Sequence, residues 1–179
     1  MLSVMKLPDN CKLVFDYAEI NQAIQRLADS LNKQLVDETP VVLCVMQGGL
    51  IFSGHLIPRL QCMLDIDYIH ATRYGNTTSG GQLTWKSYPD TVLKGRTVLI
   101  LDDILDEGHT LQSIHRYCEE QGASKVISAV LVRKKHERCV DNELTDNVAL
   151  DVEDKYVFGF GMDYDGKYRQ LDSIYALNE

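Results

Sequence analysis

The sequence lacks any hydrophobic run long enough to span a membrane, and its first ten residues contain Lys6, Pro8 and Asp9 in place of the apolar core of a signal peptide. It also lacks a basic excess, because 26 acidic residues outnumber 18 Lys and Arg and give a formal net charge of −8. This charge disfavours a nucleic-acid groove but permits local anion sites. We expect a cytoplasmic protein with neither a nucleic acid nor a membrane as partner.

Paired cysteines and flexible linkers are missing as well. The five cysteines are widely spaced and form no Cys-x-x-Cys pair, so we expect reduced thiols and no zinc site. No repeat, low-complexity tract or stretch rich in proline, glycine and serine divides the chain. For 179 residues with 45% hydrophobic content, we expect one domain over 1–179.

Hydrophobic periodicity alternates between helical and extended along the chain. Apolar residues recur at helical spacing over 20–35, after a capping box formed by Asp16 and Glu19. A second helix is expected over 50–60, and a third ends at Gly122. Strands separated by helices predict an α/β fold with a mostly parallel twisted sheet flanked by helices. The segments expected to be extended are 41–46, 63–74, 82–88, 98–101, 125–132 and 157–160.

One segment joins a strand that is apolar throughout to acids, a glycine and a hydroxyl. The apolar run 98–101 is followed by Asp102-Asp103-Ile104-Leu105-Asp106-Glu107-Gly108-His109-Thr110, and a helical pattern then begins. The acids are therefore expected on a strand-to-helix loop, at the edge where α/β sheets bind ligands. Gly108 allows an anion to approach the N–H groups of the helix N-terminus, and Thr110 adds a donor.

The adjacent acids Asp102 and Asp103 suit a different ligand group. Ionised carboxylates only accept hydrogen bonds, so they fit the vicinal hydroxyls of a ribose or a divalent cation and would repel phosphate. Phosphate is then expected over 108–110, which gives the polarity of a ribose 5-phosphate site. The alternative is a solvated loop whose aspartates cap the next helix. The apolar strand before the acids and the Gly-x-Thr after them favour the site.

This segment resembles the phosphoribosyl pyrophosphate (PRPP) motif of the type I phosphoribosyltransferases. It differs at Asp102, where purine-salvage members often carry Glu, and at Glu107, where Thr or Ser is usual. The phosphate assignment requires the Glu107 side chain to point to solvent. The resemblance implies that Asp106 acts at purine N7 as general base or charge stabiliser. It also implies a PRPP site made of Asp102, Asp103, Asp106, Glu107, Gly108, His109 and Thr110.

The last third of the chain is similar to the hypoxanthine-guanine subgroup of this family. Lys134 stands in the register of the subgroup's purine-reading lysine, whose ammonium can donate to O6 of the base, and Arg133 is a neighbouring candidate. An aromatic-Val segment, an Asp-Tyr pair and a later Arg follow. The resemblance implies a purine site of Lys134, Tyr156, Val157 and Asp163, and Mg²⁺ as cofactor on Asp102, Asp103 and Asp163. It also implies pyrophosphate contacts from Gln47, Gly48 and Arg169.

Two further segments match less closely. Arg73-Tyr74 stands where Ser-Tyr commonly begins a lid loop in this family, and 75–85 corresponds to that loop. Gln47 stands where Lys or Arg is common, so the pyrophosphate contact there depends on the backbone N–H groups of the turn.

Each of these segments also has a plain structural interpretation. The run 133–138 is typical of a solvated surface, the aromatics over 156–160 are typical core residues, and 163–166 is typical of a turn. The occurrence of all these segments in the order typical of the phosphoribosyltransferases favours the resemblance over the structural interpretations. The resemblance implies a phosphoribosyltransferase core over about 38–150, with a small hood formed by the N-terminal segment and about 151–179.

The function implied is purine salvage by Mg²⁺-dependent transfer of phosphoribose from PRPP to N9 of hypoxanthine or guanine. The products are IMP or GMP and pyrophosphate, and family members generally assemble as homodimers or homotetramers. A xanthine-preferring enzyme is the main alternative. A nucleotide-sensing RNA-binding regulator of the same fold is a second alternative, disfavoured by the net acidity and the lack of an Arg-rich run. A phosphate-binding nucleotidase or nucleoside triphosphatase is a third, disfavoured by the absence of its motifs.

Overall fold

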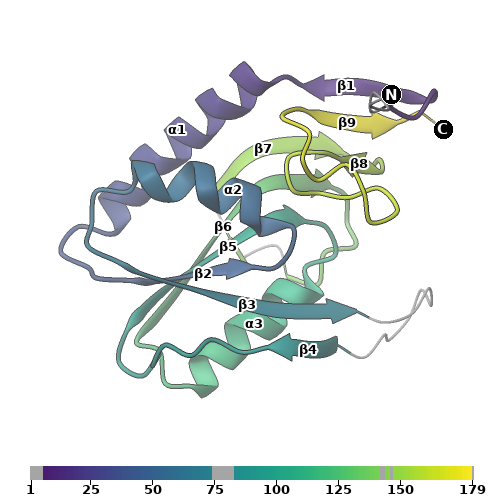
Figure 1. Ribbon diagram of the computed structural model, residues 1–179. Helices are drawn as coiled ribbons and strands as arrows, with labels where there is room; N and C mark the ends of the chain where they lie inside the picture. The colour runs from purple at the N-terminus through teal and green to yellow at the C-terminus, as the bar shows by residue number, and fades with distance from the viewer. Residues whose placement is uncertain (1–5, 74–82, 142–143, 146, 179) are drawn as a thin grey trace, which may run out of the picture.

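A six-stranded sheet forms the centre of the molecule, with strand order β4-β3-β2-β5-β6-β7 (Figure 1). The computed structural model describes residues 6–73, 83–141, 144–145 and 147–178. Neighbouring strands are parallel except at β4, which runs antiparallel to β3. This confirms the predicted mostly parallel α/β sheet. The strands are β2 (Val41–Val45), β3 (Asp65–Arg73), β4 (Leu83–Ser87), β5 (Thr97–Leu105), β6 (Lys125–Lys135) and β7 (Asn147–Glu153).

Helices cover both faces of this sheet. Helices α1 (Tyr17–Gln34) and α2 (Gly49–Leu56) lie on one face, a 3₁₀ turn at Ile57–Arg59 continues α2, and α3 (His109–Glu120) lies on the other face (Figure 1). The predicted capping box is present at the start of α1, and Gly122 adopts a φ of +80° just after α3. In the described part of the chain, no helix is both long and apolar enough to cross a membrane.

The central strands bury both of their faces. Val42 and Leu99 pack with α1 and α2, whereas Leu43 and Ile100, one residue further along, pack with α3. All four side chains have no exposed surface. Alternate residues of one strand thus belong to two different cores, which explains why β2 and β5 are apolar throughout. The carboxyl ends of these strands are held rigidly, and the site is built there.

A second, three-stranded antiparallel sheet brings the two ends of the chain together. Its order is β1-β9-β8, formed by β1 (Cys11–Phe15), β9 (Ile174–Leu177) and β8 (Val157–Phe158). It stands beside the carboxyl ends of the central strands, as the predicted hood (Figure 1). Strand β8 is shorter than predicted because Gly159 and Phe160 have φ values of +97° and +49° and turn the chain.

Strand β5 is longer than the sequence predicts. The prediction ended it at Leu101, but its ladder with β6 continues from Asp102, opposite Val130, to Leu105, opposite Arg133. The reason is that β6 itself runs on to Lys135 and supplies partners for the extra residues. The prediction that Asp102 and Asp103 lie on a loop is therefore wrong, since both are strand residues.

Candidate active site

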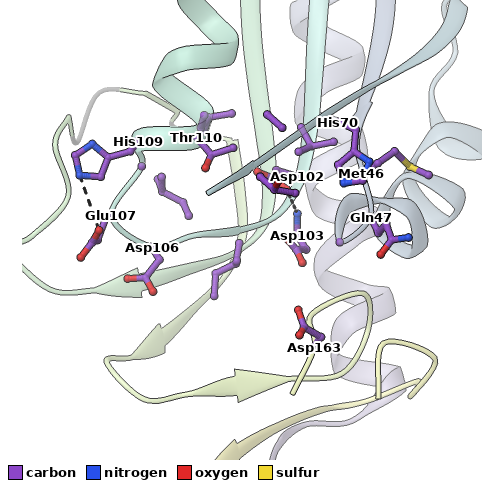
Figure 2. Close-up of a pocket in the computed structure, with 18 of the residues that line it drawn as sticks. Met46, Gln47, His70, Asp102, Asp103, Asp106, Glu107, His109, Thr110 and Asp163 are labelled. Carbon is purple, nitrogen blue, oxygen red and sulfur yellow. Dashed lines mark hydrogen bonds and ion pairs between the residues drawn. The ribbon is translucent and has the colours of Figure 1, made fainter. Parts of the chain in front are cut away.

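A cleft of about 590 Å³ lies where β2 and β5 end. Its walls are the turn after β2, the end of β5 with the loop to α3, the ends of β3 and β4, and two side chains from the segment between β8 and β9. In Figure 2, Asp163 reaches toward Asp103 from the hood side of this cleft. The predicted site residues that line it are Gln47, Gly48, Asp102, Asp103, Asp106, Glu107, Gly108, His109, Thr110, Asp163 and Arg169.

The loop before α3 presents the N-terminus of this helix to the cleft. Gly108 has a φ of +81°, a backbone conformation that favours glycine, and a Cβ there would lie 2.9 Å from a terminal methyl of Leu144. The first turn of a helix leaves N–H groups without helical partners, and the helix dipole adds partial positive charge. Thr110 lines the cleft in this first turn. The loop is thus a binding site suited to phosphate.

Glu107 points away from the acidic pair. Its carboxylate lies 3.8 Å from Nε2 of His109, and both side chains are close to half-exposed. Figure 2 shows Glu107 and His109 facing each other on the side of the loop remote from Asp102 and Asp103. The extra carboxylate is therefore turned toward His109 and not toward the buried acids.

Asp102 and Asp103 are buried, with 7% and 9% of each residue exposed. Burial and the neighbouring carboxylate raise the pKa of Asp102 well above its ordinary value. Burial also raises the pKa of Asp103, although hydrogen bonding with Asp102 and the charge of Arg169 oppose this rise. The Arg169 guanidinium stands 4.0 Å from Oδ2 of Asp103. Two buried acids with so little positive charge beside them form a favourable site for a cation.

Arg169 joins the hood to the central sheet. Its Nη2 lies 2.6 Å from Oδ1 of Asp163, and its Nη1 donates to the Gly161 carbonyl oxygen at 2.6 Å.

A Cβ on Gly161 would lie 2.1 Å from the Gly48 carbonyl oxygen, and a Cβ on Gly48 would lie 1.9 Å from Asp103. The hood thus contacts the turn after β2 at a distance that only glycine allows.

Asp106 has a different environment from the buried pair. Lys134 Nζ donates to its Oδ2 at 2.6 Å, and His136 Nε2 lies 2.7 Å from its Oδ1. Burial works to raise the pKa of Asp106, but the hydrogen bonds from Lys134 and His136 outweigh it and hold the pKa below its ordinary value. Asp106 is therefore ionised at neutral pH. A second hollow of about 310 Å³ adjoins it, lined by Lys134, His136 and Cys139 among others.

Comparison with known protein families identifies this arrangement. The model of the phosphoribosyl transferase domain matches residues 14–167. The chain belongs to the phosphoribosyl transferase domain family. The prediction made from the PRPP motif is confirmed, and the cleft at the end of β5 is the candidate active site of a phosphoribosyltransferase.

Relatives of this phosphoribosyltransferase match over nearly its full length. The hypoxanthine-guanine phosphoribosyltransferase of Streptococcus thermophilus (strain CNRZ 1066) is 33% identical over 169 residues, which are 94% of this chain and 93% of that protein. The hypoxanthine-guanine-xanthine phosphoribosyltransferase of Tritrichomonas foetus is 29% identical over 179 residues, 100% and 98% of the two chains. A crystal structure of a hypoxanthine phosphoribosyltransferase from Staphylococcus aureus is similar, with a TM-score of 0.87 and 27% sequence identity. The match covers 93% of this chain and 91% of that one.

The predicted purine residues of the phosphoribosyltransferase are not gathered in one cavity. Lys134 contacts Asp106 behind the cleft. Tyr156 is 50% exposed, and its hydroxyl donates to the Asp163 carbonyl oxygen at 3.1 Å. The Val157 side chain is buried in the core below the hood. Of the predicted purine set, only Asp163 lines the large cleft within the described residues.

The predicted lid can be placed only in part. Arg73 ends β3, whereas Tyr74 and 75–82 lie outside the described residues. The rest of the predicted lid, 83–85, belongs to β4, which lies in the segment 82–88 that is also predicted to be extended. His70 and Lys86, which the sequence did not indicate, line the cleft from β3 and β4. Burial, and then the charge of Lys86, lower the pKa of His70. Only the pairing of the two strands brings these side chains together, so no local pattern could have predicted them.

The donor chemistry of the cleft fits magnesium. Mg²⁺ usually takes one or two carboxylates together with substrate phosphates and water, and buried Asp102 and Asp103 supply such oxygens. Asp163, the third predicted ligand, is paired with Arg169. The described residues also contain a cluster that could hold a metal ion, formed by Asp106, His136 and Asp154, whose ligand atoms lie within 4.8 Å of one another. Lys134 and Arg138 already pair with the two carboxylates of that group.

Proposed function

We propose that this phosphoribosyltransferase transfers phosphoribose from PRPP to N9 of hypoxanthine or guanine in purine salvage, giving IMP or GMP and pyrophosphate. One observation carries the proposal. The end of β5 places a buried acidic pair, an ionised aspartate bound to a lysine, and a helix N-terminus next to one another. These groups match the ribose, the purine and the 5-phosphate of the product. The names of the S. thermophilus and T. foetus relatives support the same substrates.

Substrate binding follows from the charges along the cleft. The backbone of 107–110 and the Thr110 hydroxyl hold the 5-phosphate, and Asp102 and Asp103 accept hydrogen bonds from the ribose hydroxyls. The Gln47–Gly48 turn and Arg169 bind the pyrophosphate. Mg²⁺, held by Asp102, Asp103 and Asp163, supplies positive charge for the leaving group when bound. The lid that begins at Arg73 and Tyr74 excludes water, which competes with the purine for C1′ of the sugar.

The purine is recognised at Asp106. Lys134 donates a hydrogen bond to O6 of the base. Adenine carries an amino group at the same position, and this group cannot accept that hydrogen bond. Tyr156 supplies an aromatic face, and the Val157 carbonyl accepts from the edge of the base. As the N9–C1′ bond forms and the C1′–oxygen bond to pyrophosphate breaks, positive charge develops on sugar and base. Asp106 acts near N7 as general base or charge stabiliser: its carboxylate balances the developing positive charge, and the proton that the base loses leaves from N7 to Asp106 or to solvent.

The test is incubation with PRPP, Mg²⁺ and each of hypoxanthine, guanine, xanthine and adenine, followed by ultraviolet difference spectra. We expect product from hypoxanthine and guanine, none from adenine, and none after chelation of the metal. Faster turnover of xanthine than of the other bases would support the xanthine-preferring alternative. Absence of turnover with every oxopurine would refute the proposal.

We further propose that the enzyme acts in the cytoplasm as a homodimer or homotetramer, with the whole chain as one functional unit. The described structure leaves all five cysteines unpaired, which fits a reducing compartment. Apolar surface for assembly is supplied by Met63, which precedes β3, and by Ile66 and Tyr68 on β3; they are 81%, 62% and 48% exposed. Light scattering at assay concentration tests the assembly, and a monomer under those conditions would contradict it.

A further inference from the structure

His136 occupies an unusual environment for a residue of a strongly charged segment. Its side chain is only 5% exposed, although its neighbours Lys135 and Arg138 are 67% and 55% exposed. Its Nε2 lies 2.7 Å from Asp106 Oδ1, and its Nδ1 accepts the backbone N–H of Arg138 at 3.1 Å. A backbone N–H can only donate, so Nδ1 carries no proton and Nε2–H is the donor to Asp106. The structure thus selects one neutral tautomer of His136.

The turn that carries His136 is itself anchored. The Arg138 guanidinium donates to both carboxylate oxygens of Asp154, at 2.7 and 2.8 Å. Such a bidentate pair fixes orientation as well as distance. Asp154 directly follows β7, so the anchor connects the segment after β6 to the end of the neighbouring strand. A continuous set of contacts therefore runs from Asp154 through Arg138 and His136 to Asp106.

We propose that His136 is a positioning residue for the transfer reaction, which holds the Asp106 carboxylate by Oδ1 and leaves Oδ2 and Lys134 for the purine. The inference rests on the proposed function. In the free protein, Lys134 occupies Oδ2 of Asp106. When Lys134 turns to O6 of the base, Oδ2 becomes available to the hydrogen on N7, while His136 still fixes the carboxylate through Oδ1.

The neutral state of His136 matters for this role. A second cation on Asp106 would cancel the charge that the carboxylate directs at the reacting purine and sugar. A neutral imidazole donates a hydrogen bond without adding charge, so Asp106 remains an anion after Lys134 leaves it. His136 therefore supplies orientation, and Lys134 supplies recognition.

The tautomer of His136 is measurable without activity. Long-range ¹H–¹⁵N correlation spectra of the unliganded protein should show His136 protonated at Nε2 and unprotonated at Nδ1. The Asp106→Asn variant should shift the Nε2–H signal of this residue. A tautomer protonated at Nδ1, or rapid averaging of the two nitrogens, would overturn the inference whatever the enzyme's substrate is.

The kinetic test compares two substitutions at one position. His136→Leu removes the donor, and we expect kcat with hypoxanthine to fall about tenfold or more while KM for PRPP stays within about twofold. His136→Gln carries an amide nitrogen at a similar reach to Nε2, so it should restore most of kcat. An unchanged kcat in His136→Leu, an equal loss in both variants, or a rise in PRPP KM that matches the loss of kcat would overturn the inference.

A matched control is available on α3, in a histidine that contacts β6. His115 on α3 is a partly buried imidazole whose Nε2 lies 3.0 Å from Ser128 Oγ of β6, and it does not line the cleft. His115→Leu should keep kcat and both KM values. If the wild-type enzyme turned over no oxopurine, the proposed function would fail and the positioning role with it, whereas the tautomer would stand as measured. The two failures are therefore distinguishable.

Discussion

Two acidic sites three residues apart on one segment have opposite electrostatic environments. Asp102 and Asp103 are buried in β5 and have raised pKa values, with a guanidinium at 4.0 Å. The Asp106 side chain is 40% exposed, has a lowered pKa and is hydrogen-bonded to Lys134 and His136. The difference follows from β6, which lies opposite. Its residue facing Asp102 is Val130, whereas its end is basic.

The comparison separates two kinds of functional acid. The buried pair carries an unfavourable charge that a bound cation would relieve, so it is stabilised only in the working complex. Asp106 is already ionised and oriented before any ligand arrives. Substitutions that neutralise one site or the other should therefore differ in both activity and stability.

The largest effect is expected from Asp106→Asn. Without the charge near N7, kcat should fall about 100-fold or more, while PRPP affinity stays within about threefold because the phosphate loop and ribose acids are untouched. Steady-state kinetics with hypoxanthine and PRPP binding by calorimetry measure the two quantities. Unchanged turnover would refute the assignment of Asp106.

Asp151 provides the matched control for that substitution. It is also an acid held by two cations, with Arg133 Nε at 2.9 Å and Lys135 Nζ at 3.3 Å, but it lies outside the cleft. Asp151→Asn should leave kcat within about twofold, since surface ion pairs contribute about 0–1 kcal/mol. A comparable loss of turnover in both variants would mean that charge pairing on β6, and not chemistry, explains the effect of Asp106→Asn.

The next effect concerns purine recognition by Lys134. Loss of a hydrogen bond to a charged donor costs about 1.5–3 kcal/mol, so Lys134→Met should lower kcat/KM for hypoxanthine about 10- to 100-fold. Lys135→Met, which removes a 67% exposed ammonium one residue away, should have little effect. Competition assays among hypoxanthine, guanine and adenine measure the change in kcat/KM. Equal losses in the two lysine variants would contradict the purine-reading role.

Asp102→Asn should separate stability from activity. The pKa of Asp102 is higher in the folded than in the unfolded protein, so ionisation of this carboxyl destabilises the folded state. The loss of unfolding free energy is complete above the folded pKa and absent below the unfolded pKa, which is near 4. The variant should gain unfolding free energy at pH 7.5, lose activity, and show a shrinking gain toward pH 4. Urea denaturation at several pH values measures this.

Asp106→Asn should show the opposite pH dependence in the same measurement. Its folded pKa is lowered, so the ionised carboxylate contributes stability above the unfolded pKa, which is lost as pH falls through the folded pKa. The variant should be less stable than wild type at pH 7.5 and equal to it in strong acid. The same sign of stability change at pH 7.5 in both variants would refute the electrostatic difference between the two sites.

The sequence predicts the parts of this molecule that local pattern determines. The capping box at Asp16 and the two-sided burial of β2 and β5 are confirmed, because periodicity and side-chain chemistry specify them. Strands β1 and β9 were missed, since Cys11 pairs with Leu177 at the other end of the chain and β1 is partly exposed. Strand β7 was missed because it is a largely half-exposed edge strand.

The site shows the same division between local and long-range information. Residues Asp102 to Thr110 all line one cleft, because one strand and one loop carry them. His136 was hidden in a charged run typical of solvated surface, and only the fold of that run against Asp106 buries it. The pairing of Arg138 with Asp154 likewise depends on β7 lying beside β6, which no local spacing predicts.

The smallest effect is expected from Glu107→Gln, which tests where the phosphate end of the acidic segment begins. The Glu107 carboxylate lies 3.8 Å from His109 Nε2, in a half-exposed position remote from the buried acids. Its loss should change KM for PRPP less than about twofold, because exposed pairs are worth about 0–1 kcal/mol. Kinetics at low and high salt measure the change. A carboxylate that faced the phosphate would repel it, so a clearly tighter PRPP complex in this variant would contradict binding by the 107–110 backbone.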